Sequence, residues 1–285
     1  MAKSTLSLKQ NNRVLQVIVY IVSIFLCLLS ITPFYIMFIN ATRSTEDIQA
    51  HAIALLPSIY MQRNWNVLLT KDFSVPVGFK NSLIISVCST ALAIYFSTLT
   101  AYAISAYEWK LKRPFFKFIV GIMMIPGQIT MVGFYQMIYK IHMVNQLWVL
   151  IVPSIAVPMT VFFMKQYMDA SLSIEIVESA RIDGAREFYT FNKIILPIMK
   201  PAIATQAIFS FVASWNNLFI PLVLLTDKSN YTLPIMTKLL NGDIYRVEHG
   251  TIYLALSLTA IPLIVIYLVL SKYIVEGVAM GSVKG

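Results

Sequence analysis

Six apolar stretches, each long enough to cross a lipid bilayer as a helix, constrain this chain more than any other feature of its sequence. An α-helix needs about 20 mainly apolar residues to cross the ~30 Å hydrocarbon core of a bilayer. None of the 13 acidic residues lies in the middle of a stretch, and the long basic side chains of Lys117, Lys165 and Lys272 lie near stretch ends, within reach of the headgroups. The sequence therefore predicts an all-α integral membrane protein with six transmembrane helices, near residues 14–39, 82–106, 115–139, 146–168, 202–225 and 252–274.

The composition explains why these stretches cannot belong to a soluble protein. Hydrophobic residues make up 58% of the 285 residues and charged residues only 12%, about half of the ~25% expected of a soluble domain. So few charges, with a mean hydropathy of +0.73, exclude a soluble domain, a disordered chain, a coiled coil and a small disulfide scaffold. Cys27 and Cys88 lie inside apolar stretches, and we interpret them as small hydrophobic residues rather than as a disulfide or a metal site.

The distribution of Lys and Arg predicts the orientation in the membrane. With both termini in the cytoplasm, the inner segments hold 14 Lys or Arg and the outer loops hold 8, in equal total lengths of 74 residues. Cytoplasmic loops carry an excess of Lys and Arg, so both termini are predicted to be cytoplasmic. The net charge of +9 then reflects topology, not a nucleic-acid partner. The first stretch is too long for a signal peptide, and we expect an uncleaved helix.

This topology divides the chain into a six-helix transmembrane domain, residues 14–275, and two cytoplasmic tails, residues 1–13 and 276–285. The domain contains two long external loops and one long cytoplasmic loop: 40–81, 226–251 and 169–200.

A stripe of polar side chains runs along the fifth predicted span. Gln206, Ser210, Ser214 and Asn217 recur at intervals of three or four residues, which places them on one face of a helix. Such a face either packs and hydrogen-bonds against a neighbouring helix or lines the path of a solute. The sequence leaves both interpretations open.

The sequence lacks the motifs of the common catalytic sites. No segment matches the phosphate-binding G-x-x-x-x-G-K-[ST] loop, H-E-x-x-H or G-x-S-x-G, and the three histidines have no metal-ligand spacing. We therefore predict that the chain is not an enzyme and binds no metal or cofactor. A carrier driven by protons or sodium usually keeps ionisable groups at the middle of the membrane, and none is found there. A secondary transporter is accordingly disfavoured, and the energy for any transport must come from elsewhere.

The cytoplasmic loop 169–200 carries a helix–turn–helix pattern. Ser173 is predicted to cap a first helix, and Gly184 is predicted to end it by adopting a positive φ. A second helix is expected over residues 185–196 and should end at Pro197. One face of the first helix carries small or apolar residues: Ile174, Val177, Ala180 and Gly184.

This loop resembles the cytoplasmic motif of permease subunits of bacterial binding-protein-dependent ABC importers. That motif is E-A-A, three residues, G, nine residues and then I-x-L-P. Here it reads Glu178-Ser179-Ala180, three residues ending at Asp183, Gly184, nine residues, and Ile194-Ile195-Leu196-Pro197. The spacing is complete, and the one departure is Ser179 in place of the middle alanine.

The resemblance extends over nearly the whole chain and is strongest to the maltose-type branch, which takes up oligosaccharides. It is carried by short segments in several spans and at the C-terminus: Asn81-Ser82-Leu83, Ala101-Tyr102-Ala103, Trp215-Asn216 and Gly281–Gly285. It implies a type I ABC importer permease in a bacterial cell membrane, with six spans and both ends inside.

The resemblance also implies partners and site residues. The partners are a second homologous permease chain in a heterodimer, two ATPase subunits that hold ATP and magnesium, and an extracellular solute-binding protein that delivers a sugar or oligosaccharide to the external loops. The tail Gly281–Gly285 is expected near the ATPase. The residues expected to couple to the ATPase lie in the motif: Glu178, Ser179, Ala180, Asp183, Gly184, Ile194, Leu196 and Pro197. Candidates for the substrate path are the polar stripe and aromatic residues able to stack on a sugar ring: Gln206, Ser210, Ser214, Trp215, Asn217 and Tyr135, with Tyr167 as a further aromatic.

Three alternatives remain at this stage. The chain could be an ABC permease for another solute, such as glycerol phosphate or an amino acid. It could be a secondary transporter, although the sequence shows no ion-coupling site. It could be a membrane scaffold, which would not explain the motif spacing.

Overall fold

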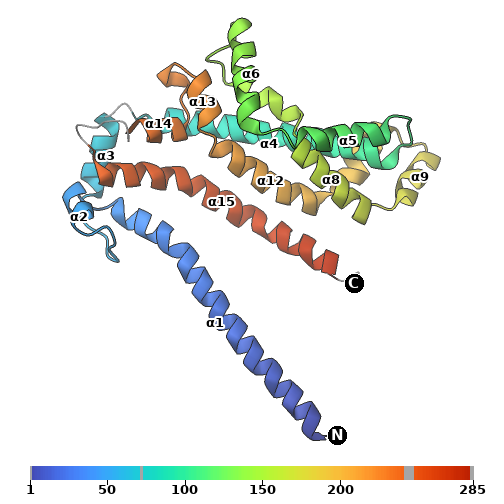
Figure 1. Ribbon diagram of the computed structural model, residues 1–285, viewed down its shortest axis with the longest axis horizontal. Coiled ribbons are helices and arrows are strands. Elements are labelled where there is room, and N and C mark those ends of the chain that lie inside the picture. The colour runs from blue at the N-terminus through green and yellow to red at the C-terminus, as the bar shows by residue number, and fades with distance from the viewer. Residues whose placement is uncertain (1, 71–72, 241–246, 283–285) are drawn as a thin grey trace. The chain divides into compact units, whose positions relative to one another are not determined.

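The computed structural model describes residues 2–70, 73–240 and 247–282, and within these ranges it contains helices and no strand (Figure 1). Parts of the predicted external loops and of the C-terminal tail, residues 71–72, 241–246 and 283–285, lie outside the described residues. The chain divides into two compact units. Unit 1 consists of Met1–Asp72 with Leu240–Leu258, and unit 2 consists of Phe73–Leu239 with Thr259–Gly285.

The first part of the chain forms three helices, and the last helix starts in unit 1 and continues into unit 2: α1 (Ala2–Asn40), α2 (Thr45–Ala50), α3 (Met61–Thr70) and α15 (His249–Ser282). The remaining helices belong to the stretch that makes up most of unit 2: α4 (Val75–Ala106), α5 (Lys112–Ile122), α6 (Gly127–Lys140), α7 (Trp148–Ile151), the 3-10 turn η1 (Val152–Ile155), α8 (Pro158–Ser171), α9 (Ile174–Ile182), α10 (Glu187–Thr190), the π-helical turn η2 (Phe191–Ile195), α11 (Leu196–Ile198), α12 (Lys200–Trp215), α13 (Phe219–Leu224), the 3-10 turn η3 (Lys228–Asn230) and α14 (Leu233–Leu240).

Four helical segments of the described chain are long and apolar enough to cross a membrane: Leu15–Asn40, Val75–Ala106, Trp148–Ser171 and His249–Val269. Two further pairs of helices pass the same test together but are bent, by 94° between α5 and α6 and by 80° between the segments Glu187–Ile198 and Lys200–Trp215. The described residues therefore contain four candidate spans, or up to six if each bent pair is one span.

The predicted fifth span, 202–225, is not one continuous helix. α12 ends at Trp215, and α13 begins only at Phe219. The Asn216 N–H still donates to the Val212 carbonyl at 3.0 Å, but the Asn217 N–H turns to the Ser214 carbonyl at 3.2 Å, which tightens and ends the helix. Asparagine competes for backbone hydrogen bonds, so hydropathy alone could not locate this break.

The core of unit 2 is built around α4, which packs against α8 and α12 (Figure 1). Ser89, Ala93, Ser97 and Ala101 recur every four residues on α4 and are all at most 5% exposed. Small side chains on one helical face let neighbouring helices approach closely. Ala101 of this face also belongs to a cluster of buried side chains whose large members include Tyr102, Met164, Met168, Phe191 and Met199.

Unit 1 contains a buried polar clasp near the start of the predicted external loop. Arg43, 7% exposed, donates to the Asn40 side chain at 3.0 Å and to the backbone carbonyls of Asp47 and His51, each at 2.8 Å. The Asn64 side chain donates at 2.9 Å to two carbonyls, one of them that of Arg43.

A glycine completes this clasp. A Cβ added at Gly250 would lie 2.3 Å from the Arg43 carbonyl oxygen and 2.5 Å from Asn64 Nδ2. No side chain fits this approach between backbones, so the start of this predicted external loop is held in a defined fold.

Candidate functional site

The helix α9 and its exit form the first candidate site. As predicted, α9 begins directly after Ser173, and its end at Ile182 is followed two residues later by Gly184, whose φ is +76°. The Ala185 N–H donates to the Ala180 carbonyl at 2.9 Å, and the Gly184 N–H donates to the Arg181 carbonyl at 3.0 Å, which closes the helix end. The predicted cap is wrong in its detail, because the Ser173 hydroxyl bonds to the Glu175 carboxylate at 3.0 Å and not to the backbone.

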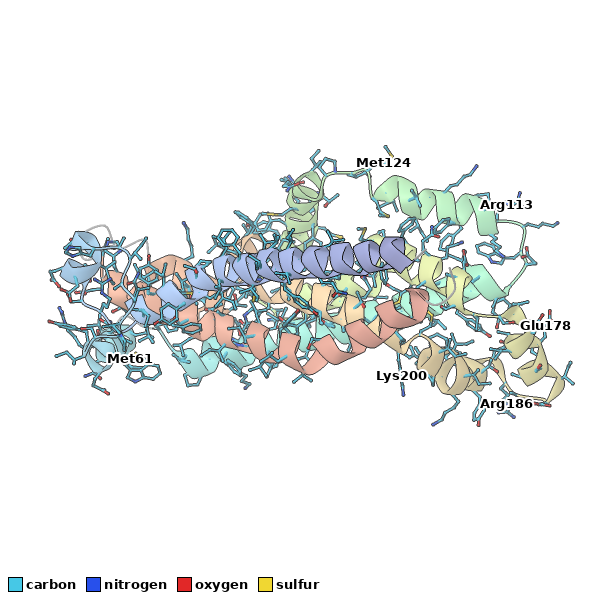
Figure 2. The ribbon with its side chains drawn as sticks, turned by 90° about the horizontal axis from the view of Figure 1, so that it is seen from below. Met61, Arg113, Met124, Glu178, Arg186 and Lys200 are labelled. Carbon is cyan, nitrogen blue, oxygen red and sulfur yellow. The ribbon has the colours of Figure 1, made fainter. Side chains whose placement is uncertain are left out.

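α9 has one buried side and one open side. Val177 and Ala180 are buried, at 0% and 6% exposure, whereas Glu178, Ser179 and Asp183 are exposed. The predicted apolar face is only partly covered, since Ile174 is 44% exposed. In Figure 2, Glu178 and Arg186 project at the same end of unit 2 as Arg113 of α5. Large apolar side chains are also exposed here, Ile176 and Ile182 on α9 and Phe188 and Tyr189 on α10, and no sequence motif pointed to them.

The second helical segment differs from its prediction at both ends. It runs from Glu187 to Ile198 instead of 185–196, and it continues past Pro197. The π-helical turn η2 precedes α11, so that Pro197 falls in the first turn of α11, where a missing N–H is tolerated. The predicted motif residues Ile194 and Leu196 are half-buried and Pro197 is exposed.

Four side chains from three elements meet next to α9, and the sequence reading missed them. This Glu187 cluster consists of Tyr102 and Tyr107 at the end of α4, Arg181 on α9 and Glu187 at the start of α10. Arg181 Nε donates to Glu187 Oε1 at 2.9 Å, and both tyrosine hydroxyls donate to Glu187 Oε2, Tyr102 at 3.2 Å. The Arg181 guanidinium also lies over the Tyr107 ring, 4.9 Å from its centre.

These contacts favour the ionised carboxylate. The Tyr107 hydroxyl, followed by the Arg181 guanidinium and the Tyr102 hydroxyl, holds the pKa of the Glu187 carboxyl below its ordinary value of 4.5. No sequence pattern could reveal the cluster, because Tyr107 and Glu187 are 80 residues apart.

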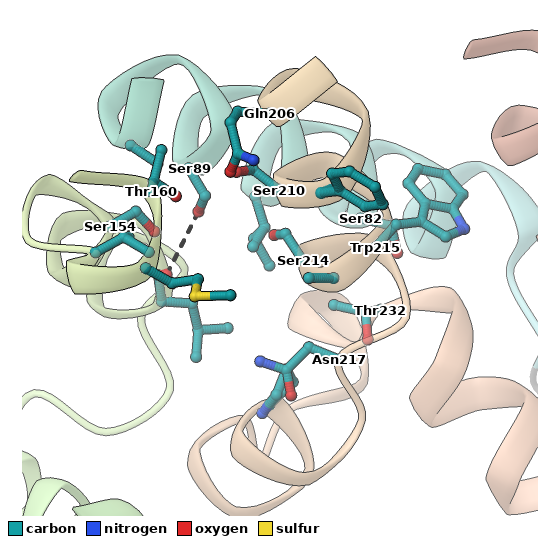
Figure 3. A pocket seen from close by; sticks show the side chains of 18 residues that line it. Ser82, Ser89, Ser154, Thr160, Gln206, Ser210, Ser214, Trp215, Asn217 and Thr232 are labelled. Carbon is teal, nitrogen blue, oxygen red and sulfur yellow. Dashed lines mark hydrogen bonds between the residues drawn. The ribbon is translucent and has the colours of Figure 1, made fainter. Parts of the chain in front are cut away.

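The second candidate site is a cavity of about 380 Å³ in unit 2, bordered by α4, η1, α8 and α12 (Figure 3). None of the described residues that line it is charged. Ten of them carry a side chain with a hydrogen-bonding group: Ser82, Ser89, Ser154, Thr160, Gln206, Ser210, Ser214, Trp215, Asn217 and Thr232. We call this space the polar cavity.

Most of these groups have spare hydrogen-bonding capacity. Among the side chains drawn in Figure 3, the one hydrogen bond marked joins the Ser89 hydroxyl to the Leu150 carbonyl at 3.5 Å. The Thr232 hydroxyl is buried with no partner in the described chain, and Gln206 is only 8% exposed. Ser82 is an exception, because its hydroxyl accepts the Leu233 N–H at 2.9 Å. A polar group left without a partner in an apolar environment costs free energy, so these groups favour a hydrated or ligand-filled space.

The structure brings together five of the six predicted path residues. Gln206, Ser210, Ser214, Trp215 and Asn217 all line the polar cavity. Trp215 lies at its edge: it is 1% exposed, stacks on Phe211 at 5.5 Å, and donates its indole N–H to the Thr259 carbonyl at 3.0 Å.

Both tyrosines considered for stacking on a sugar lie elsewhere. Tyr135 packs against an apolar cluster around Ile138 and Val149, and Tyr167 packs against the core around Met168. The cavity gains Ser154 and Thr160 instead, from elements whose polar residues showed no continuous stripe in the sequence.

Metal-ligating residues do not gather in the part of the chain that the structure describes. No group of three or more His, Cys, Asp or Glu side chains lies close enough there to hold an ion.

Comparison with known proteins identifies the family. Residues 93–280 match the family described as binding-protein-dependent transport system inner membrane component. The chain is 31% identical to the arabinooligosaccharides transport system permease protein AraQ of Halalkalibacterium halodurans, over 92% of this chain and 94% of that protein. It is 32% identical to the melibiose/raffinose/stachyose import permease protein MelC of Bacillus subtilis, over 89% and 91%. It is also 33% identical to the trehalose/maltose transport system permease protein MalG of Thermococcus litoralis, over 77% and 79%.

A solved structure shares the fold. It is the crystal structure of a bacterial ABC transporter involved in the import of the acidic polysaccharide alginate, with a TM-score of 0.77 at 20% identity, covering 92% of this chain and 97% of that chain. The family match and the relatives together confirm the resemblance seen in the cytoplasmic loop. The chain is therefore a multi-pass membrane protein that belongs to the family of inner membrane components of binding-protein-dependent transport systems, permease subunits of ABC transporters that are not themselves enzymes.

Proposed function

We propose that this chain is the permease subunit of an ATP-driven importer of uncharged saccharides. The observation that carries the proposal is the polar cavity, which is rich in hydroxyl and amide groups and lined by no charged residue. Sugars are recognised by such hydrogen-bonding groups, whereas a phosphate or carboxylate calls for basic side chains. The volume of about 380 Å³ lies within the range of small-ligand pockets. Relatives named for arabinooligosaccharides, for melibiose and for maltose support the same substrate class.

The substrate path proposed here passes the polar residues of α12 and Asn217, which follows the end of that helix. Gln206, Ser210, Ser214 and Asn217 would contact the saccharide, and Ser154 and Thr160 would face them. Trp215 supports the cavity edge through its buried packing, and its indole N–H is already engaged. Tyr135 has no part in this path, because it packs into a separate apolar cluster.

α9 is proposed to dock onto an ATPase subunit. Its exposed Glu178 offers a carboxylate to a basic partner, Ser179 beside it is small, and the exposed Ile182 offers apolar surface. ATP and magnesium would be held by two partner ATPase subunits, and ATP binding would move α9 and the helices packed against it between two states. A second homologous permease chain would complete the path, and an extracellular binding protein would deliver the saccharide. The tail proposed to approach the ATPase, Gly281–Gly285, lies largely outside the described residues.

The membrane topology proposed is six spans with both termini in the cytoplasm. The cytoplasmic side is assigned by the distribution of Lys and Arg. Contacts within unit 2 support the predicted alternation of sides, because segments predicted on one side of the membrane lie together. On the predicted inner side, the Ser105 hydroxyl donates to the Asp169 carboxylate at 2.7 Å, next to the Glu187 cluster. On the predicted outer side, the Asn145 N–H donates to the Leu224 carbonyl and the Asn230 side chain to the Asn145 carbonyl, both at 2.8 Å.

Uptake by the reconstituted transporter tests this function. The chain is purified with its co-expressed ATPase, partner permease and binding protein, and proteoliposomes are supplied with radiolabelled raffinose, maltotriose, alginate oligosaccharide, glycerol 3-phosphate or an amino acid mixture. We expect ATP-dependent uptake of a neutral saccharide. Uptake restricted to a charged solute, or uptake driven by an ion gradient without ATP, would contradict the proposal.

Neighbouring asparagines provide a matched pair of variants for the same assay. Asn217 lines the polar cavity, whereas the exposed Asn216 does not. Asn217→Ala is expected to lower uptake about tenfold, the effect of losing one or two hydrogen bonds to a ligand. Asn216→Ala should leave uptake unchanged. Equal effects of the two substitutions would argue against this path.

A further inference from the structure

We propose that Glu187 is a positioning residue that makes α9 and the cytoplasmic end of α4 move as one body. This inference rests on the proposed docking of α9 onto an ATPase. If α9 receives the movement of the ATPase, something must pass that movement to the helices that border the polar cavity. The Glu187 carboxylate joins the two elements directly.

Both oxygens of the carboxylate are used, and each faces a different element. Oε1 accepts from Arg181 of α9 at 2.9 Å. Oε2 accepts from Tyr102 and Tyr107 at the end of α4. The Arg181 guanidinium also lies 4.9 Å from the centre of the Tyr107 ring, so α9 and the end of α4 touch a second time. A carboxylate with three donors in different directions fixes orientation, which apolar contact does not.

The α4 side of this connection is firmly anchored. Tyr102 is 2% exposed, and its ring contacts Phe191 and Tyr107 at centre distances of 5.8 and 5.6 Å. From Tyr102, α4 continues without interruption to Ser89 and Ser82, which line the polar cavity. A displacement of the cytoplasmic end of this helix therefore reaches the cavity through a single continuous element.

We expect the Glu187 cluster to fix the orientation of α9 relative to α4 and to add little to the free energy of folding. The side chains of Arg181 and Glu187 are 36% and 46% exposed, and ion pairs this open to solvent contribute little to folding. A test of Glu187 must therefore follow movement, because a stability measurement cannot separate a positioning residue from an ordinary surface pair.

Two spin labels on this chain report whether α9 and α4 move together. One is attached to the native Cys88, which is exposed on α4, and the other to Ile174→Cys, which is 44% exposed at the first position of α9, ahead of the proposed docking residues, with Cys27→Ser removing the remaining cysteine. The labelled chain is purified in complex with its ATPase and partner permease. Pulsed electron paramagnetic resonance then gives the distance distribution without nucleotide and with magnesium, ATP and vanadate, which trap a closed ATPase pair.

With Glu187 intact, we expect the same distribution in both nucleotide states. With Glu187→Gln, which keeps the size of the side chain but has one acceptor oxygen, we expect a nucleotide-dependent shift of about 2 Å or a clear broadening. Glu108→Gln is the matched control, because Glu108 follows Tyr107 directly and pairs with Lys112 at 2.7 Å outside the cluster. Tyr107→Phe removes one hydroxyl and leaves the ring under Arg181, and it replaces Glu187→Gln if that variant does not assemble.

The outcomes separate this inference from the proposed function. A Glu187→Gln or Tyr107→Phe distribution that is independent of nucleotide would overturn the positioning role. A nucleotide-dependent shift in the chain with Glu187 intact would also overturn it, because α9 and α4 would not form one body. If the ATPase does not co-purify with the unmodified chain, the proposed docking of α9 fails before the positioning role is tested.

Discussion

The Glu187 cluster and the polar cavity are both built from polar side chains of unit 2, and both involve α4, yet they use these side chains in opposite ways. In the cluster, the hydroxyls of Tyr102 and Tyr107 and the Arg181 guanidinium all bond to one carboxylate. In the polar cavity, most hydroxyl and amide groups have no partner in the described chain.

This difference separates polar groups that fix the orientation of neighbouring helices from polar groups that stay open to water or a ligand. A satisfied group at a helix contact contributes to packing, and its removal leaves partners unpaired. A group with spare capacity contributes little to folding and remains open to water or a ligand. Substitutions in the two regions should therefore affect different measurements.

The largest expected effect comes from placing a charge in the polar cavity. Gln206→Glu puts a carboxylate among groups that include no basic residue. A charged side chain at the middle of a membrane helix costs about 2.5–3.5 kcal/mol, so saccharide uptake should fall about a hundredfold. Proteoliposome uptake measures this, and co-purification of the ATPase shows that the complex still assembles. Gln206→Met, which has a similar size and no charge, should lose about tenfold, and equal losses would show that charge is not what the cavity excludes.

Ser82 and Ser210 both line the polar cavity, but only the Ser82 hydroxyl is bonded within the described chain, so the two serines test whether bonded and open groups have different roles. Ser82→Ala leaves the buried Leu233 N–H without its acceptor and should lower the free energy of unfolding by about 1–3 kcal/mol. Ser210→Ala removes a hydroxyl that lines the cavity and should change stability by less than about 0.5 kcal/mol while lowering uptake. Thermal unfolding in detergent, together with uptake, distinguishes the two. Similar melting temperatures for both variants would contradict the distinction between polar groups bonded within the protein and polar groups left open to a ligand.

A smaller effect is expected at the turn that brings Glu187 back to Arg181. Gly184 has a φ of +76°, and nothing lies within 4 Å of a Cβ added there, so a side chain meets backbone strain but no collision. Gly184→Leu should cost about 1–2 kcal/mol and weaken ATPase association roughly tenfold. Gly184→Asn should retain most of the association, because asparagine tolerates this conformation. Titration of the solubilised chain with purified ATPase provides the measurement, and comparable binding by both variants would show that the turn is not required.

The smallest effect concerns pH. The pKa of Glu187 is lower in the folded chain than its ordinary value of 4.5, so the unfolded state binds the proton more tightly. The stabilisation from the cluster is therefore fully present above pH 4.5 and is lost as pH falls through the lowered pKa. Chemical unfolding of the unmodified chain and of Glu187→Gln between pH 3.5 and 7 should show a constant difference at neutral pH that disappears in acid. A difference that grew in acid would have the wrong sign.

The sequence predicted those features that depend on neighbouring residues. Hydropathy located the four candidate spans that are not bent pairs, and the Gly184 turn followed from local chemistry and spacing. Of the predicted polar stripe, Gln206, Ser210 and Ser214 lie on α12, whereas Asn217 follows its end, and the sequence could not decide whether these residues pack or border a cavity. That choice depends on Ser154 and Thr160, which other elements bring to the same place.

Features made by distant residues remained hidden. The Glu187 cluster joins positions 80 or more apart, and the clasp of unit 1 joins Arg43 and Asn64 to Gly250. The interruption at Asn216 was missed for another reason. Two asparagines in an apolar run barely alter the average hydropathy, so hydropathy does not mark the residue at which the helix ends.

The bend between α5 and α6 has a consequence for the lipids around the protein. At 1.5 Å per residue, the 11 residues of α5 measure about 16 Å and the 14 residues of α6 about 21 Å. At 94° to each other, the two cannot both follow the bilayer normal, and neither alone matches the ~30 Å thickness of the hydrocarbon core. Such hydrophobic mismatch is relieved by local thinning of the bilayer or by association with another chain. The equilibrium between the conformations of this transporter should therefore depend on the acyl-chain length of the lipids. Membrane thickness would then alter the transport rate even though the polar cavity and the Glu187 cluster are unchanged.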